Sequence, residues 1–167
     1  MAIICHQLFR AGTVLALAAG LAACQGMEKK VQPGTPLAAV EAEYGRPDFT
    51  CTRPDGRQRV IWTLQPNGQY AWGTDVNGDG RIVRMEALLT DEHFRRLGTG
   101  TWTPDQVQCE FGPPAQIDEV GLPSVRQVVW SYRYKQDDVW FSLMYVYFGH
   151  DGSHVTNFHP GPDHRDR

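Results

Sequence analysis

The hydrophobic and polar positions of this 167-residue chain follow one pattern twice. Residues 40–47 return as residues 107–114, with valine, glutamate, an aromatic residue, glycine and proline in the same register. The Val-Ile-Trp segment at 60–62 returns as Val-Val-Trp at 128–130. Because internal repeats constrain a fold more strongly than single motifs, the chain is predicted to hold two tandem copies of one structural unit.

Each copy is predicted to begin with a short helix, over residues 36–44 and residues 104–111. A threonine N-cap precedes a proline at the first helical position of both, where the missing N–H is not needed. Gly45 and Gly112 allow the left-handed residue that ends a helix, and a proline follows two residues later in each case. A helix of two turns is not stable alone, so each helix is expected to pack on its own copy.

Strands and turns fill the remainder of both copies. In the first copy the expected strands are residues 50–53, 59–64, 69–76 and 81–87, separated by glycine-containing turns. A second helical stretch begins after Thr90 and ends at Gly98, and strands with β-branched and aromatic residues follow at 128–134 and 139–148. The predicted fold class is α+β. Each copy, over residues 34–88 and 89–160, is expected to be a short helical pair packed on a three- to four-stranded antiparallel sheet.

The N-terminal residues are typical of an export signal. One basic residue, Arg10, precedes a small, apolar run over residues 11–23, which is shorter than the ~20 residues of a membrane span. The run ends in Leu-Ala-Ala-Cys, which resembles the lipobox of bacterial lipoproteins and predicts that Cys24 is lipidated after cleavage. An ordinary cleavable signal is the alternative. Gln25 stands where lipoproteins of the inner membrane typically have aspartate, so the outer membrane is favoured.

Two polar segments flank the predicted copies. Residues 24–33 are expected to be a tether between lipid and fold, and residues 161–167 a disordered tail. Without residues 1–23, whose one charged side chain is Arg10, the chain has 15 basic and 19 acidic residues and a net charge of −4. This mild acidity argues against nucleic acid as a partner.

The sequence predicts no catalytic residue, no cofactor and no metal, because nucleophile-elbow and nucleotide-binding motifs are missing. His150 and His154 are expected to flank a turn, His159 to lie beyond the last strand and His164 in the tail. This spacing does not favour a zinc site. Residues 75–86 match the EF-hand loop at positions 1, 3, 5, 6 and 12, but a strand pattern precedes them where an EF-hand needs a helix. A β-turn is therefore favoured, and calcium is the alternative.

Cys51 and Cys109 are the only cysteines of the predicted mature chain besides Cys24. In an oxidising compartment they could form a disulfide between the two copies, and two unpaired thiols are the alternative. Cys109 lies about 200° around its helix from Val107, off the apolar stripe, so it could face the other copy. Spacing along the chain does not decide between the two.

The order of these motifs resembles the SmpA/OmlA family, the BamE-like outer-membrane lipoproteins. The shared features are a lipobox, a Gly-Thr-x-x-x-x-Val helix ending in Gly-x-Pro, a Trp-containing strand, and an aromatic strand leading through Asp-Gly into a last strand. The resemblance is clearest over residues 103–155 and looser over residues 34–83. It implies a helical pair on an antiparallel sheet, lipid anchoring at the periplasmic face of the outer membrane, and an accessory role in barrel assembly.

Because the unit occurs twice, the chain is also similar to the β-lactamase inhibitory proteins, in which two such units form one concave sheet that grips another protein. This similarity implies an alternative function as an inhibitor-like periplasmic protein-binding module. Asp137 and Asp138, between two strands of the second copy, are candidates for an acidic plug. Under both comparisons the partner is a protein.

The aromatic strand of the second copy provides a candidate partner surface. Its alternate residues Phe141, Leu143, Tyr145 and Tyr147 are expected on the sheet face that points away from the helices. An exposed aromatic patch is typical of a protein-binding surface. Burial of this patch against the first copy is the alternative.

Overall fold

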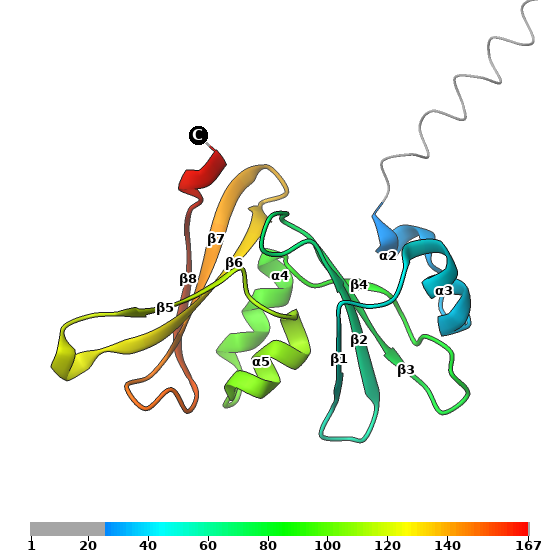
Figure 1. The fold of residues 1–167 in the computed structure, drawn as a ribbon, viewed down its shortest axis with the longest axis horizontal. Coiled ribbons are helices and arrows are strands. Elements are labelled where there is room, and N and C mark those ends of the chain that lie inside the picture. The colour runs from blue at the N-terminus through cyan, green and yellow to red at the C-terminus, as the bar shows by residue number, and fades with distance from the viewer. Residues whose placement is uncertain (1–25, 167) are drawn as a thin grey trace, which may run out of the picture.

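The computed structural model describes residues 26–166 and has an α+β fold with two antiparallel four-stranded sheets (Figure 1). The first sheet has the order β1-β2-β3-β4 and the second β5-β6-β7-β8. The strands are β1 (Phe49–Thr52), β2 (Gln58–Thr63), β3 (Ala71–Val76), β4 (Glu86–Ala87), β5 (Gln116–Val120), β6 (Gln127–Gln136), β7 (Trp140–Phe148) and β8 (Val155–Pro162). The α-helices are α2 (Met27–Lys30), α3 (Leu37–Tyr44), α4 (Asp91–Phe94) and α5 (Pro104–Phe111), and the 3-10 helices are η2 (Arg95–Gly98), η3 (Pro123–Val125) and η4 (His164–Asp166). The predicted signal peptide and Cys24 lie outside the described residues.

Helices and sheets alternate across the molecule (Figure 1): α2 and α3, then the first sheet, then α4 and α5, then the second sheet. The alternation of side chains along β2 explains why the first sheet is covered twice. Val60 and Trp62 belong to a core cluster with residues of α2 and α3, whereas Ile61 belongs to the cluster of Phe94 and Phe111. The second sheet packs on α4 and α5 with one face. The two sheets are separate, so they do not form the single concave sheet implied by the inhibitor-like comparison.

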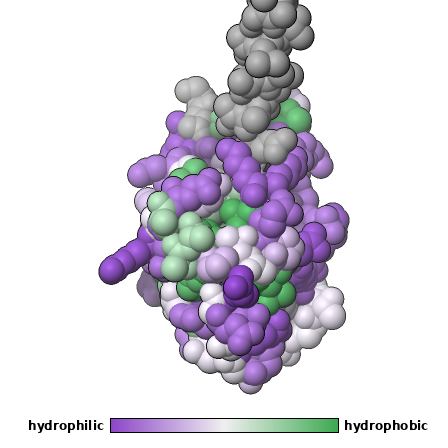
Figure 2. Space-filling model, turned by 90° about the vertical axis from the view of Figure 1, so that its right-hand side faces the viewer, coloured by the Kyte–Doolittle hydropathy of each residue, from purple (hydrophilic) through white to green (hydrophobic). Residues whose placement is uncertain are grey.

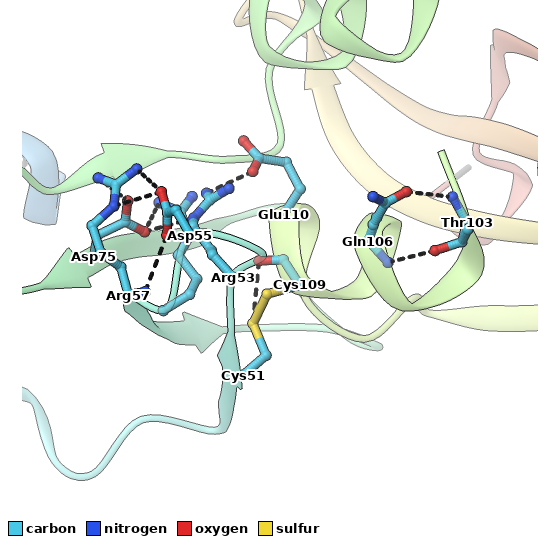
Figure 3. Close-up of a disulfide and its surroundings, with 10 residues drawn as sticks. Cys51, Arg53, Asp55, Arg57, Asp75, Thr103, Gln106, Cys109 and Glu110 are labelled. Carbon is cyan, nitrogen blue, oxygen red and sulfur yellow. Dashed lines mark hydrogen bonds and ion pairs between the residues drawn. A yellow bond between two sulfur atoms is a disulfide. The ribbon is translucent and has the colours of Figure 1, made fainter. Parts of the chain in front are cut away.

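The helix starts differ between the two halves. At α5, Thr103 Oγ1 accepts the N–H of Gln106 at 3.3 Å, and Gln106 Oε1 accepts the N–H of Thr103 at 2.9 Å (Figure 3). This reciprocal capping box agrees with the predicted start of the helix. The predicted threonine cap of α3 is wrong, because the Thr35 hydroxyl donates to the carbonyl of Gln32 at 2.6 Å and α3 has no side-chain cap.

The fourth predicted strand is also corrected. It covers only Glu86–Ala87 rather than residues 81–87. Arg81 and Ile82 instead form isolated bridges to Pro36 and Val76. The N–H of Val83 still donates to the carbonyl of Asp75 in β3 at 2.8 Å, so the segment runs beside β3 without forming a continuous strand.

The predicted tether over residues 24–33 is wrong for residues 27–31, which belong to the fold. Met27 and Val31 are 6% and 8% exposed and pack in the core cluster of the first sheet. Their i, i+4 spacing places them on one side of a helical turn. Trp72 Nε1 donates a hydrogen bond of 2.7 Å to Glu28 Oε2, which also holds this segment on the sheet.

The tail predicted over residues 161–167 is wrong for residues 161–166. Gly161 and Pro162 complete β8, and η4 follows. Asp163 is 5% exposed and accepts a hydrogen bond of 2.5 Å from Arg133 Nε. A buried arginine needs such a carboxylate, so this ion pair holds the end of the described chain.

The two sheets also meet through the β2–β3 loop. β5 pairs with β6 only as far as Ser131, whereas β6 stays paired with β7 on its other side as far as Gln136. Gln65 Nε2 donates to the carbonyl of Arg133 at 2.8 Å, and Gln65 Oε1 accepts the N–H of Arg133 at 3.2 Å. The side-chain amide of Gln65 therefore takes the position that a next residue of β5 would have, and it connects the first half of the protein to the second.

A disulfide between Cys51 and Cys109 connects β1 to α5 (Figure 3). The two Cα atoms are 5.8 Å apart, and 58 positions separate the residues along the chain. The sequence left this pairing open. In the structure, the bond links the first sheet to the helix layer that packs between the sheets.

Replacing both cysteines with serine is expected to lower the free energy of unfolding by about 4 kcal/mol, because the unfolded chain regains the conformational freedom of a loop of this length. Equilibrium unfolding in urea with and without reductant measures the effect. Reductant should destabilise the wild type and leave the Cys51→Ser/Cys109→Ser variant unchanged. Equal stability of the oxidised wild type and this variant would contradict the assignment of the bond.

Candidate protein-binding surface

The outer face of the second sheet carries the residues predicted to bind a partner. Along β7, the inward residues Met144, Val146 and Phe148 are buried in the core cluster with α4 and α5. The alternate residues point to the opposite face, which no helix covers in Figure 1. Among them Phe141 is 45% exposed, and partly exposed side chains follow at Leu143, Tyr145 and Tyr147. We call these four residues the outer aromatic patch.

The neighbouring strand β8 extends this patch with a histidine. His159 pairs with Tyr145 across the two strands, and their ring centroids are 5.6 Å apart. The ring of Tyr147 stacks on His159 with centroids 5.4 Å apart, and Tyr147 Oη lies 3.1 Å from His159 Nε2. Sequence reasoning missed His159 as a member of the patch. The repeat alignment ended before this residue. Spacing from Val155 would also have placed His159 on the core face, because the register of β7 and β8 shifts between Tyr147 and Phe148.

Strand β6 supports the tyrosines from the side. Ser131 pairs with Tyr145 and Val129 pairs with Tyr147, so they share the outer face with them. Ser131 and Val129 are nevertheless only 3% and 2% exposed. Gly161 of β8 lies so close to Tyr145 that a Cβ atom there would be 2.7 Å from the ring. The patch is therefore packed in place before any partner arrives, which reduces the entropy cost of binding.

An ion pair closes one end of the patch. Arg133 is opposite Leu143 in the strand register and pairs with Asp163. Burial raises the pKa of Asp163, but the hydrogen bonds from Arg133 and from the backbone N–H of Arg165 outweigh it and hold the pKa below its ordinary value. The charged carboxylate is thus stable beside the aromatic side chains.

A second polar cluster lies between the first sheet and α5 (Figure 3). Glu110 is 2% exposed, and Oε2 of this residue accepts a hydrogen bond of 2.6 Å from Arg53 Nη2. Its other oxygen, Oε1, lies 2.7 Å from both Arg96 Nη1 and His93 Nε2. Burial raises the pKa of Glu110, but the hydrogen bond from His93 and the charges of Arg59 and Arg53 hold it well below the ordinary value.

Asp75 belongs to the same cluster. Its carboxylate is 2.7 Å from Arg53 Nε, 2.8 Å from Arg57 Nη1 and 3.3 Å from Arg59 Nη1. This residue is the first position of the calcium-loop match, so in the structure arginines occupy the carboxylate that calcium would need. We therefore assign this cluster a structural role, in which it holds the two halves of the protein together.

The rest of that loop forms a turn. Asn77 Oδ1 accepts the N–H groups of Asp79 and Arg81 at 3.1 and 2.9 Å. These bonds are typical of an Asx-type turn. Between residues 26 and 166, no group of three or more His, Cys, Asp or Glu side chains is arranged to hold a metal ion.

No family model and no curated protein matches this chain, so the SmpA/OmlA resemblance stays a prediction. Among solved structures, the chain is similar to a DUF4309 family protein (YjgB) from Bacillus subtilis, with 17% sequence identity. The match covers 75% of this chain and 77% of that chain, and the TM-score is 0.29. A TM-score of this size does not indicate a shared fold or function. Within the described part of the chain, no helix has the length and hydrophobicity needed to cross a membrane.

Proposed function

We propose that this protein is an outer-membrane lipoprotein that faces the periplasm and acts as a protein-binding accessory in barrel assembly or envelope maintenance. The observation that carries the proposal is the outer aromatic patch, a packed and uncovered aromatic surface on the second sheet. It occurs in a chain whose N-terminus reads as a lipoprotein signal ending at Cys24. Aromatic surfaces of this kind are favoured in protein interfaces.

We further propose that the two halves are copies of one BamE-like unit. In each half a short helix, α3 or α5, precedes an antiparallel meander. Both helices are followed by a glycine with positive φ, 82° at Gly45 and 84° at Gly112. Under this proposal, the second copy kept an open sheet face while the first copy used the equivalent face to pack on α4 and α5.

The alternative is an inhibitor-like module that enters the active site of a periplasmic enzyme. The observation in its favour is the turn after β6, where exposed Asp137 and Asp138 have positive φ values of 51° and 59°. Residues other than glycine rarely adopt this conformation, and such strain is concentrated at functional sites. Against it stands the separation of the two sheets, which removes the concave gripping surface.

Membrane fractionation and crosslinking in the native host test the proposal. The tagged wild type should fractionate with the outer membrane and crosslink to barrel-assembly components, and the Cys24→Ser variant should leave the membrane fraction. The Tyr145→Ala/Tyr147→Ala variant should remain membrane-bound but lose the crosslinked components. Recovery of one soluble periplasmic enzyme in their place would favour the inhibitor-like alternative and contradict the assembly role.

A further inference from the structure

Large hydrophobic side chains are exposed around the point where the described chain begins. Gly26 lines one surface depression together with Tyr70, Lys135 and Asp138, and another together with Leu64. Leu64 and Tyr70 are 50% and 43% exposed. Although far apart in sequence, the start of α2, the β2–β3 loop and the β6–β7 turn therefore lie at one end of the molecule, the upper end in Figure 1.

The β6–β7 turn adds the most exposed aromatic residue to this end. Val139, Trp140 and Phe141 are 59%, 67% and 45% exposed. Lys135 Nζ lies 3.7 Å from the centre of the Phe141 ring, so this lysine connects the depression beside Gly26 with the aromatic turn. We call Leu64, Tyr70, Val139, Trp140 and Phe141 the anchor-side cluster.

The chain leaves little distance between this cluster and the predicted lipid. Cys24 precedes Gly26 by two positions, and two residues span at most about 7 Å. Met27 is fixed in the core, so no flexible tether follows Gly26. A lipid on Cys24 would therefore hold this end of the protein against the membrane surface.

We propose that the anchor-side cluster inserts into the bilayer interface and fixes the orientation of the protein on its membrane. The inference rests on the proposed lipidation of Cys24 and adds a second attachment made by the folded chain itself. Trp and Tyr favour the membrane interface, because their rings are apolar and their polar atoms remain hydrated. Lys135 can extend its charged end to the headgroups from the same position. In this orientation Phe141 is the residue of the outer aromatic patch that lies nearest the membrane. The rest of the patch extends away from the bilayer.

The charges around the cluster favour insertion of apolar side chains over attraction to anionic lipid. Lys29 and Lys135 share their depression with Glu28 and Asp138, so the acids balance the lysines locally. Figure 2 shows the neighbouring α2 and α3 end of the molecule as mainly hydrophilic, with small and separate hydrophobic areas. The attachment should therefore depend on Trp140 and its apolar neighbours and change little with salt.

Quenching of tryptophan fluorescence by brominated lipid tests the proposal. The full lipoprotein is purified from membranes and reconstituted into vesicles of phosphatidylethanolamine and phosphatidylglycerol whose acyl chains carry bromine. Bromine within the acyl chains quenches only rings that reach that depth. The wild type should lose part of its emission, and the Trp140→Tyr variant should lose most of this quenching. A Leu122→Ser variant, whose leucine is 71% exposed on the distant β5–β6 connection, should behave as the wild type.

Mass spectrometry of the same samples shows whether Cys24 is lipidated. A failure of the lipid anchor can therefore be distinguished from a failure of the insertion. Diacylated Cys24 with equal quenching in the wild type and Trp140→Tyr, or with no quenching, would overturn insertion while keeping the lipid anchor. The cluster would then be a surface for contact with protein. An unmodified Cys24 in the membrane-purified protein would overturn the anchor and the insertion with it. Quenching that persists in high salt and requires Trp140 supports the proposal.

Discussion

Replacing Glu110 with glutamine is expected to lower the free energy of unfolding by about 3–5 kcal/mol, the cost of removing one partner from a buried ion network. The variant removes the carboxylate that His93 contacts. It also removes one of the two carboxylates beside Arg53 and beside Arg96, so that only Asp75 and Glu86 remain for these arginines. Because typical domains have only about 5–15 kcal/mol of stability, a loss of this size is visible in any denaturant titration.

The exposed pair of Glu119 and Arg126 provides the matched control. Their side chains are 59% and 52% exposed and approach to 2.9 Å. Glu119→Gln removes the same charge but should change the free energy of unfolding by less than about 1 kcal/mol, because water screens the pair. Equal effects of Glu110→Gln and Glu119→Gln would contradict the assigned role of the buried network.

The same network predicts how stability depends on pH. The pKa of Glu110 is lower in the folded protein than its ordinary value of 4.5, so the unfolded chain takes up a proton at a higher pH than the folded chain does. The stabilisation by Glu110 is therefore complete above about pH 4.5 and is lost as the pH falls toward the folded pKa. Unfolding free energies from about pH 6 down to about pH 3 should decline in the wild type and less steeply in Glu110→Gln. Asp163, whose pKa is also lowered, should account for part of the remaining slope.

Replacing Phe111 with alanine should lower the free energy of unfolding by about 3–5 kcal/mol through loss of burial and creation of a cavity. Phe111 is fully buried, stacks on Phe94 with ring centroids 4.9 Å apart, and contacts Tyr132 from the second sheet with centroids 6.1 Å apart. Its cluster also includes Ile61 of the first sheet, so one side chain joins three layers. Thermal and urea unfolding measure the effect.

Phe141→Ala is the control for this substitution, since it deletes the same atoms from a side chain that is 45% exposed. Its cost should stay below about 1 kcal/mol and consist mainly of the lost contact with Lys135. If the two halves were independent domains, Phe111→Ala would destabilise only the second half and produce two unfolding transitions. A single transition at lower denaturant concentration is the expected result.

Local patterns predicted the elements whose signals lie within a few residues. The capping box of Thr103 and Gln106 and the alternation along β7 are both set by neighbouring positions, and the structure places them as expected. Met27 and Val31 show the limit of this reasoning. Two apolar residues at i, i+4 in a polar stretch read as part of a tether, because their burial depends on a sheet formed much later in the chain.

The order of the layers and the ion network could not be predicted from the sequence either, because both depend on contacts between segments that are far apart in the chain. Arg53, Asp75 and Glu110 come together only when the end of β1 packs beside β3 and α5, and nothing in their local sequence marks them as partners. In the sequence, Asp75 is the first position of the EF-hand match. In the structure its carboxylate contacts arginines instead. For the outer aromatic patch, the alignment of the two halves identified the face, but His159 was missed because the last strand runs further than the repeat.

Site-specific photocrosslinking from the outer aromatic patch tests the central claim most directly. The full lipoprotein carries p-benzoylphenylalanine in place of Tyr147, or in place of Val83, which is 45% exposed on the other half of the protein and serves as the control. Irradiation of intact cells should link position 147, and not position 83, to a component of the outer-membrane barrel-assembly machinery. Equal crosslinking from both positions, or a crosslink from position 147 only to a soluble periplasmic enzyme, would contradict the account.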